Sequence, residues 1–238
     1  MTLPYRLHYA PDNASLIIRL VLEEMGLPYE TVLVDRSAQA QNSAAYLKLN
    51  PTGKIPALET PNGVISETGA ILLMLSELPQ TAPSAAGAHR IAPPPNSPER
   101  LVFLKWFFFV VNTLHPDLQT QFYLERHGPA EALPDMRHRL GQRLHHHLQR
   151  LDDWATQMPN DRPPSLLDYY IAVCLRWSAL YPRDNSDWFL LSRYPALKAL
   201  ALALETRPAV QRAQAAEGLG PTPFTAPQYA TPPEGAAT

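Results

Sequence analysis

The chain has 238 residues, with 20 Lys and Arg set against 22 Asp and Glu, and one cysteine. A formal net charge of -2 excludes the clustered positive charge with which proteins bind nucleic acids or anionic membranes. One cysteine excludes an intrachain disulfide and a thiolate zinc cluster. The amino terminus lacks a signal-like pattern, and apolar runs such as Trp106 to Val111 are too short to span a bilayer. We therefore expect a cytoplasmic protein that binds neither nucleic acid nor membrane.

The first part of the chain alternates between strand and helix patterns. A short strand at residues 5–9 precedes a helix at 13–25 and a β-branched strand at 29–34. A helix at 38–49, a hairpin of strands 55–59 and 64–66, and a helix at 67–78 follow. The order βαβ-ββα predicts an α/β domain with a four-stranded mixed sheet whose first two strands are parallel.

The second part carries helical patterns throughout. Ser165 and Asp168 form a capping-box pattern at one helix start, and Pro195 and Pro208 mark later starts. Cys174 lies in an apolar helical run, which favours a buried core position. The consecutive histidines 145–147 point about 100° apart on a helix, so we expect no metal site. An all-α second domain follows, with helices expected at 98–127, 130–158, 165–179 and 194–205.

Prolines are concentrated in two segments. Of the 26 prolines, six lie between Pro79 and Pro98 and five between Pro221 and Pro233. Because proline lacks a backbone donor and fixes φ, such stretches favour linkers and tails over packed elements. The expected division is a first domain at 1–79, a linker at 80–97, a helical domain at 98–220 and a loose Pro-rich tail at 221–238.

The first strand-to-helix junction, Tyr9 to Ser15, is a candidate anion site. A helix start offers unpaired N–H groups and the positive end of the dipole to an anion such as a thiolate. Side chains of Asn13, Ser15 or Tyr9 would add hydrogen bonds. An ordinary helix cap by Asp12 or Asn13 explains the same residues.

Two further junctions suggest recognition of a peptide. Pro56 opens a strand and is compatible with a cis bond that frees the backbone of Ile55, although a trans proline on an edge strand is the alternative. Glu67 would pair with an ammonium group, while Thr68 and the helix N–H groups would take a carboxylate. That combination suits an α-amino acid head group, and a simple helix cap is again the alternative.

These three segments, together with Asn112 to His115 and Pro164 to Asp168, resemble the cytosolic glutathione transferase superfamily, in a bacterial, beta-like or unassigned class. The resemblance implies a thioredoxin-like first domain, a homodimer and glutathione as co-substrate, with no metal. Its implied glutathione contacts are the backbone of Ile55 before cis Pro56, Glu67 with Thr68 at the γ-glutamyl end, and Lys54 near the glycyl carboxylate.

The thiol-activating residue departs from the family patterns. Ala14 stands where beta-class members have cysteine, so the thiol must arrive with the substrate. Ser15, Asn13 and Tyr9 remain as candidate catalytic residues. The resemblance implies an electrophile site between the domains, at Trp106, Phe109, Asn112 and His115.

We expect a transferase that attaches glutathione to a hydrophobic electrophile, as in detoxification, or a related isomerase, reductase or ether-cleaving enzyme. The missing cysteine motivates the alternative of a binding or scaffolding module without turnover.

Overall fold

The first half of the chain folds into a four-stranded mixed sheet with helices. The computed structural model describes residues 5–78, 90–159, 161–183 and 185–237. The strand order is β2-β1-β3-β4, with β1 parallel to β2 and antiparallel to β3. This confirms the predicted α/β, thioredoxin-like fold class. The elements are β1 (Tyr5–Tyr9), α1 (Ser15–Met25), β2 (Tyr29–Leu33), η1 (Ala40–Asn42), α2 (Ala44–Leu49), β3 (Ala57–Thr60), β4 (Gly63–Ser66) and α3 (Thr68–Glu77).

The helix predicted at 38–49 is wrong in its first half. Gln39 has a positive φ of 53°, and a single 3₁₀ turn, η1, follows it. Ser43 then caps α2, because its side chain accepts a hydrogen bond from the N–H of Tyr46 at 3.2 Å. A serine hydroxyl that competes for backbone donors thus divides the segment into two short pieces.

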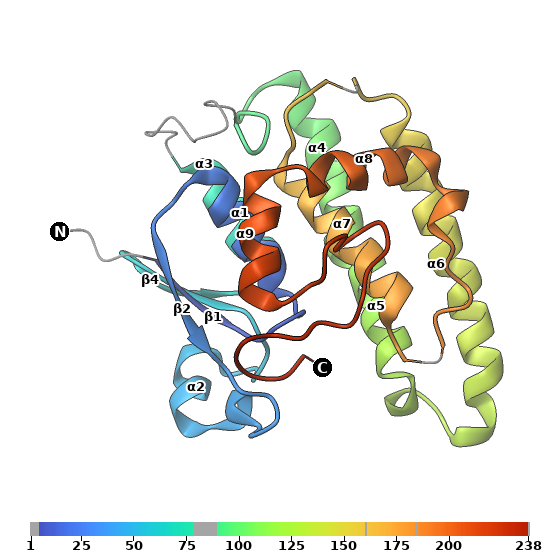
Figure 1. Ribbon diagram of the computed structural model, residues 1–238, viewed down its shortest axis with the longest axis horizontal. Coiled ribbons are helices and arrows are strands. Elements are labelled where there is room, and N and C mark those ends of the chain that lie inside the picture. The colour runs from blue at the N-terminus through green and yellow to red at the C-terminus, as the bar shows by residue number, and fades with distance from the viewer. Residues whose placement is uncertain (1–4, 79–89, 160, 184, 238) are drawn as a thin grey trace.

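The second half is helical, as predicted, and packs beside the sheet domain (Figure 1). Five of its helices have proline at the first or second position, where a missing N–H costs nothing. Pro208 opens a further helix, of which the sequence analysis predicted only the start. The elements are α4 (Pro98–Phe109), a π-helical segment η2 (Val110–Leu114), α5 (His115–Phe122), η3 (Leu124–Arg126), η4 (Ala130–Ala132), α6 (Leu133–Ala155), α7 (Leu166–Leu180), η5 (Leu191–Arg193), α8 (Pro195–Glu205) and α9 (Pro208–Glu217).

The joined helix α4–η2–α5 covers residues 98–122, within the helix predicted at 98–127, and is apolar well beyond the run Trp106 to Val111. By length and composition alone it could cross a bilayer, because an 18-residue window within Pro98–Phe122 has a mean hydropathy of 1.2. Its inward side chains Phe103, Phe107, Val110 and Leu114 are buried in the core shared with α7. Only 28% of the apolar window is buried, so core packing accounts for one side of this helix and leaves much of its apolar surface exposed.

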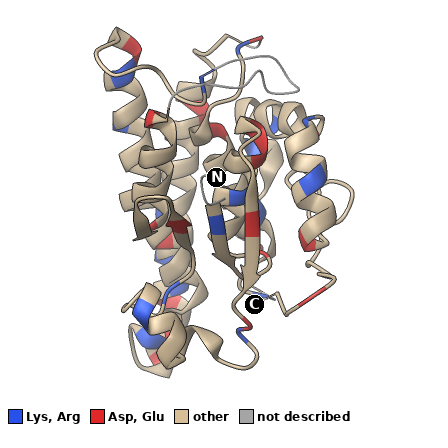
Figure 2. Ribbon diagram, turned by 90° about the vertical axis from the view of Figure 1, so that its left-hand side faces the viewer, with Lys and Arg blue, Asp and Glu red and all other residues tan. Residues whose placement is uncertain are grey.

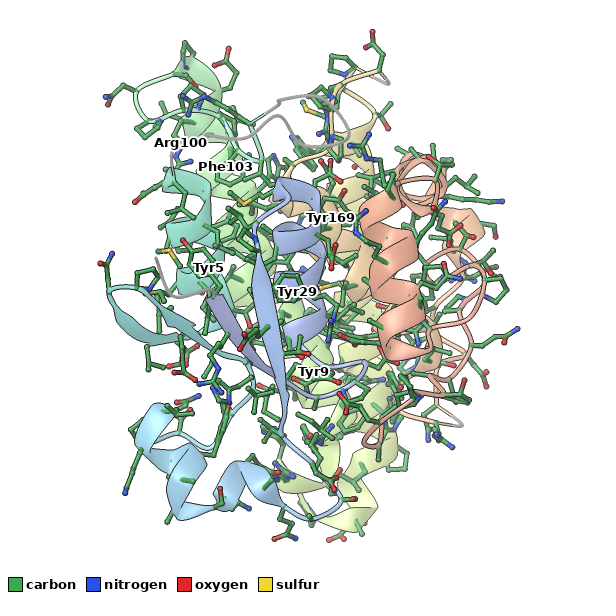
Figure 3. All side chains as sticks on the ribbon, turned by 60° about the vertical axis from the view of Figure 1, so that its left-hand side comes forward. Tyr5, Tyr9, Tyr29, Arg100, Phe103 and Tyr169 are labelled. Atoms are coloured by element: carbon green, nitrogen blue, oxygen red, sulfur yellow. The ribbon has the colours of Figure 1, made fainter. Side chains whose placement is uncertain are left out.

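Helix α1 lies between the two halves and is buried on nearly every side. Every residue from Ser15 to Leu22 is buried, including Arg19, so α1 is not the usual amphipathic surface helix. Its buried charges need partners: Arg19 pairs with Glu217 at 2.7 Å, and Glu24 pairs with Arg207. Figure 3 shows Tyr9, Tyr29 and Tyr169 along α1, between the sheet and α9.

The start of α7 and its cysteine follow the sequence predictions. Ser165 and Asp168 form the capping box, and Arg162 holds both carboxylate oxygens of Asp168 at 2.6 and 2.7 Å. Cys174 is fully buried in the helix, and burial raises the pKa of its thiol. This cysteine is therefore an inert core residue.

The C-terminal tail is not loose, which corrects the sequence prediction. Phe224 is 1% exposed, and the N–H of Thr231 donates to the carbonyl of Gly218 at 2.9 Å. In Figure 1 the segment after α9 folds back past the foot of α7 toward the sheet. Main-chain carbonyls of this segment accept hydrogen bonds from a buried arginine of α7, Arg176. Residues 80–89 of the linker predicted at 80–97 lie outside the described residues.

Candidate active site

A cleft of about 770 Å³ lies between the sheet domain and the helical half. One wall comes from the loops that precede α1, β3 and α3, and the other from η2, α5 and α7. The three junctions singled out in the sequence therefore meet at one site. The predicted site residues that line it are Asn13, Lys54, Ile55, Pro56, Glu67, Thr68, Asn112 and His115.

The loop before β3 is held by Asn50, which is 1% exposed. Its Nδ2 donates to the carbonyl of Lys54 at 2.7 Å, and its Oδ1 accepts from the N–H and hydroxyl of Thr52 at 3.2 and 2.9 Å. Tyr46 donates to the same Lys54 carbonyl at 2.7 Å. These bonds fix the main chain that leads into Ile55.

The bond between Ile55 and Pro56 is cis, as the sequence suggested. The ladder of β3 begins two residues later, at Ala57, which pairs with His8 and Ser66. Ile55 thus lies on the cleft wall outside the sheet, and its peptide groups are not used by the strand pairing.

The start of α3 presents a carboxylate and a hydroxyl to the cleft. Glu67 is an exposed non-glycine residue with a φ of 69°, a strained conformation that the fold enforces at this point. Thr68 is the first helical residue, so unpaired N–H groups of the first turn lie beside it. Gly69 faces Val111, where a Cβ would lie 2.9 Å from Val111 Cγ1. The missing side chain lets the two walls approach closely.

At the start of α1, Asn13 is the predicted catalytic candidate that lines the cleft. Its Oδ1 accepts a hydrogen bond from the N–H of Ala14 at 2.7 Å, which fixes the side chain. The amide nitrogen is then the donor end of the group. An anion in the cleft would meet this amide together with the positive end of the helix dipole.

Ser15 and Tyr9 do not reach the cleft, which corrects two predicted catalytic residues. Ser15 is fully buried, and its hydroxyl donates to the carbonyl of Ala10 at 3.0 Å. Tyr9 is 2% exposed and donates to Glu234 Oε1 at 2.5 Å, and its ring lies 4.6 Å from the guanidinium of Arg19. Burial and Glu234 raise the pKa of Tyr9, so it stays protonated. The side chain of Tyr9 points from β1 toward Arg19 of α1 and does not line the cleft.

In the helical wall, the π-helical segment η2 carries Asn112, and His115 follows at the start of α5. Such segments widen the helix by one residue, often at functional sites. Burial and the charge of Lys54 lower the pKa of His115 to about 4, so the ring is neutral near pH 7. Its Nδ1 lies 2.7 Å from the hydroxyl of Tyr170, whose pKa burial raises. The pair forms an uncharged polar patch.

Trp106 and Phe109 do not line the cleft, which corrects the predicted electrophile site. The ring of Trp106 packs 5.5 Å from Trp154, and that of Phe109 lies 5.4 Å from His147, both on α6. These two side chains are three residues apart and pack on α6, whereas the cleft is lined further along the chain by Val111, Asn112 and His115. Phe122, Trp177 and Tyr181 supply the aromatic surface instead.

The cleft residues that the sequence analysis missed include Arg36, Tyr123 and Arg126. Arg36 Nη2 donates to the Tyr123 hydroxyl at 3.0 Å across the cleft, and Arg126 lies 3.9 Å over the Tyr123 ring. Arg36 Nη1 is buried without a hydrogen-bond partner among the described residues. Two cations therefore gather around one phenol. No local pattern marks them, since they meet only in the folded chain.

Within the described parts of the chain, no three His, Cys, Asp or Glu side chains gather as a metal site. His145 pairs with the Tyr194 hydroxyl at 2.6 Å, whereas His147 pairs with Asp117 at 2.9 Å. The histidine run thus serves separate packing contacts. Basic and acidic segments alternate over both halves (Figure 2).

A thioredoxin-like domain joined to a helical domain, with a polar cleft between them, is the architecture of glutathione transferases. Residues 14–78 match the family model of the glutathione S-transferase N-terminal domain. The glutathione S-transferase GstA of Escherichia coli is 26% identical over 90% of this chain and 99% of its own length. The disulfide-bond oxidoreductase YfcG of Escherichia coli is 28% identical over 90% of this chain and 96% of its own.

Solved structures agree with this assignment. A sphingomonad glutathione S-transferase complexed with glutathione is 29% identical, with a TM-score of 0.68 over 90% of this chain and all of that one. BphK, a bacterial glutathione transferase solved as a ternary complex, is 29% identical with a TM-score of 0.72. The family model over residues 14–78, the relatives and the solved structures therefore support the glutathione transferase superfamily for this chain.

Proposed function

We propose that the protein binds glutathione in this cleft, stabilises its thiolate and transfers it to a hydrophobic electrophile. The observation that carries the proposal is the meeting of three groups at one site: the free peptide of Ile55, the strained start of α3 and the amide of Asn13. Together they match the backbone, the amino acid head group and the thiol of a γ-glutamyl peptide.

Each group of the tripeptide has a complementary partner. The carboxylate of Glu67 would pair with the γ-glutamyl ammonium, and Thr68 with the first N–H groups of α3 would bind the adjacent carboxylate. Ile55 would pair its main chain with the cysteinyl residue. Lys54 and Arg36 would hold the glycyl carboxylate, which would give the buried Nη1 of Arg36 a partner.

Thiol activation requires only modest help from the protein. A free thiol has a pKa of ~8.5, so a donor and a helix dipole that favour the thiolate raise its population near neutral pH. Asn13 would donate its Nδ2 hydrogen to the sulfur, and the released proton would pass to water. The thiolate would then attack the electrophilic atom, whose leaving group would depart with the bonding pair.

The second substrate would lie against the aromatic helical wall. Phe122, Trp177 and Tyr181 provide apolar surface, and Asn112 with neutral His115 provides polar contacts at its edge. The 28% identity to a disulfide-bond oxidoreductase favours a second candidate function, in which the thiolate attacks one sulfur of a disulfide, breaks the S–S bond, forms a mixed disulfide and releases the other sulfur as a thiolate. A module without turnover remains the third outcome to test.

The test compares Asn13→Ala with wild type. We expect Asn13→Ala to bind glutathione within about threefold of wild type but to lose about tenfold in kcat with an aromatic electrophile, because one donor to the nucleophile is gone. Binding is measured by calorimetry and turnover by absorbance. Asn62→Ala, in the hairpin between β3 and β4, is the matched control and should retain full activity.

The outcomes separate the three candidate functions. Turnover of electrophiles supports the transferase. Turnover of disulfides alone would replace it with the reductase, and glutathione binding with neither activity would leave a binding module. No binding of glutathione by wild type would overturn all three.

We further propose a cytoplasmic homodimer. A cytoplasmic location would keep the glutathione thiol reduced. Leu101 and Phe108 on α4 are 76% and 45% exposed, a large apolar face for a surface helix. A second copy of the chain would cover it, and sedimentation of Leu101→Ser should then show monomer where wild type shows dimer. A monomeric wild type at micromolar concentration would contradict the dimer.

A further inference from the structure

Arg176 on α7 is fully buried, with 0% of its surface exposed. A guanidinium in such a place is costly unless every N–H finds an acceptor. Here all five do. The Nε–H group and one N–H of Nη2 donate to the two carboxylate oxygens of Asp12, at 2.8 and 2.9 Å. The other three go to main-chain carbonyls of the C-terminal segment, those of Leu219 (3.3 Å), Pro223 (3.1 Å) and Gln228 (2.8 Å).

Asp12 is the residue that connects this arginine to the cleft. It immediately precedes Asn13 and has a φ of 50°, a left-handed conformation that a non-glycine residue adopts only when its surroundings hold it there. Its N–H donates to Glu217 at 2.9 Å, and Oδ2 also accepts from the Tyr181 hydroxyl at 2.7 Å. The loop that carries Asn13 is thus held in place by the buried charged side chains of Arg176 and Glu217.

The C-terminal segment is itself anchored at several places away from the cleft. Glu205 accepts hydrogen bonds from the N–H groups of Phe224 and Thr225, both at 2.8 Å. Further along, Tyr9 donates to Glu234, which ties the end of the segment to β1. Gly218 permits the return, because a Cβ there would lie 2.1 Å from the carbonyl oxygen of Thr231. The carbonyls that face Arg176 are therefore held in place.

We propose that Arg176 is a positioning residue of the active site, and that the docked segment 219–234 completes its coordination and so sets the geometry of Asn13. Neither Arg176 nor residues 219–234 line the cleft. They act through Asp12, whose conformation determines where the amide of Asn13 points. This inference rests on the proposed glutathione function for its catalytic consequence.

The first experiment uses Arg176→Lys and a chain that ends at Gly220. A lysine keeps the charge but loses the two-pronged contact with Asp12, and the shortened chain loses two of the three carbonyl partners. We expect kcat to fall about tenfold in each, since small displacements of a reacting group cost that much. The KM for glutathione should stay within about threefold, because Ile55, Glu67 and Thr68 are untouched.

The pKa of the bound glutathione thiol distinguishes a positioning role of Arg176 from a role in stability alone. The ultraviolet absorbance of the thiolate, followed against pH in the glutathione complex, should show a higher thiol pKa in both variants than in wild type. Asp135→Ala, which removes an exposed pair with Arg139 on α6, is the control and should change neither value. Unchanged thiol pKa and kcat in the two folded variants would overturn the proposal.

A milder pair of variants keeps the test valid if Arg176→Lys fails to fold. Tyr9→Phe and Glu234→Ala each remove the same single hydrogen bond at the far end of the segment. Because the two act through one contact, their effects on kcat should be small, equal and not additive. A large loss in Tyr9→Phe that Glu234→Ala does not reproduce would show instead that the Tyr9 hydroxyl acts on the thiol directly, against our inference.

Hydrogen exchange in the ligand-free protein distinguishes this inference from the proposed function. Shortening the chain to Gly220 should speed exchange of the Leu16 and Ile17 amides, which bond to the carbonyls of Asn13 and Ala14 at 2.8 and 3.2 Å. Faster exchange in a protein that fails to bind glutathione would support the mechanical link and overturn only the function. Unchanged exchange would overturn the link itself.

Discussion

The two walls of the cleft are built in different ways. Around the loop before β3, the sheet-domain wall depends on contacts between near neighbours in sequence, such as Asn50 with Lys54 and Tyr46 with Lys54. The helical wall depends on contacts between distant residues, such as Arg36 with Tyr123 and His115 with Tyr170. A loop held by local bonds keeps its shape whatever packs opposite it, whereas a wall held by long-range contacts depends on how the helices are placed.

The largest expected effect comes from breaking the local wall at Asn50. Asn50→Ala removes three hydrogen bonds of a buried side chain and leaves the Lys54 carbonyl with one partner fewer. We expect a loss of about 2–3 kcal/mol in the free energy of unfolding and at least about tenfold weaker glutathione binding. Urea unfolding and calorimetry measure the two, with Asn62→Ala as control. Unchanged binding would show that the loop does not depend on Asn50.

The helical wall should respond to pH through His115. Its pKa in the folded protein is about 4, below the ordinary 6.5, so the unfolded chain binds the proton more readily between these values. Stability is therefore lost as pH falls from about 6.5 to about 4, by about 2 kcal/mol for this partly exposed ring. Urea unfolding at several pH values measures the slope. His115→Gln should flatten it, and an equal slope in both proteins would contradict the assignment.

The contact between the walls is tested at Gly69. In Gly69→Ala the new methyl group would press on Val111, which costs about 1–2 kcal/mol and separates α3 from η2. The double variant with Val111→Ala should recover part of this loss in thermal unfolding. If the two single effects simply add, the residues are not in the contact described.

The smallest expected effect is at Tyr123. Tyr123→Phe removes only the hydrogen bond from Arg36 across the cleft mouth. We expect about 0.5–1 kcal/mol less stability, little change in the Kd for glutathione, and an altered KM for the acceptor. Steady-state kinetics with both substrates varied checks this. A change confined to glutathione binding would assign Tyr123 to the first wall instead.

The part of the site that the sequence predicted correctly is the part with local causes. Local signals depend on neighbours within a few residues: a proline before a strand, a cap at a helix start and an apolar period of 3.6. They are enough to predict the positions of Pro56 and Glu67 and the sequence of strands and helices. Asn13 was predicted with Ser15 and Tyr9 because composition does not say which way a loop side chain turns. Packing of this region against α9 and the C-terminal tail determines which of these side chains faces the cleft.

The errors have long-range causes. Trp106 and Phe109 were expected in the cleft because their run is apolar, but the rotation of α4 against α6 decides which apolar residues face inward. Arg36 and Tyr123 lie 87 residues apart, so no local pattern could join them. The tail was expected to be loose because its prolines cannot form a helix or strand. Its partners, Arg176 and Glu205, belong to other helices.

The prolines of that tail have a thermodynamic consequence. A proline offers a carbonyl but no N–H, so a segment rich in proline carries more hydrogen-bond acceptors than donors. Arginine has the opposite imbalance, with five donors and no acceptor. The segment can therefore surround the buried Arg176 and leave few donors of its own unsatisfied. Each ring also restricts the undocked chain, so ordering this segment sacrifices less entropy than ordering a glycine-rich one of equal length.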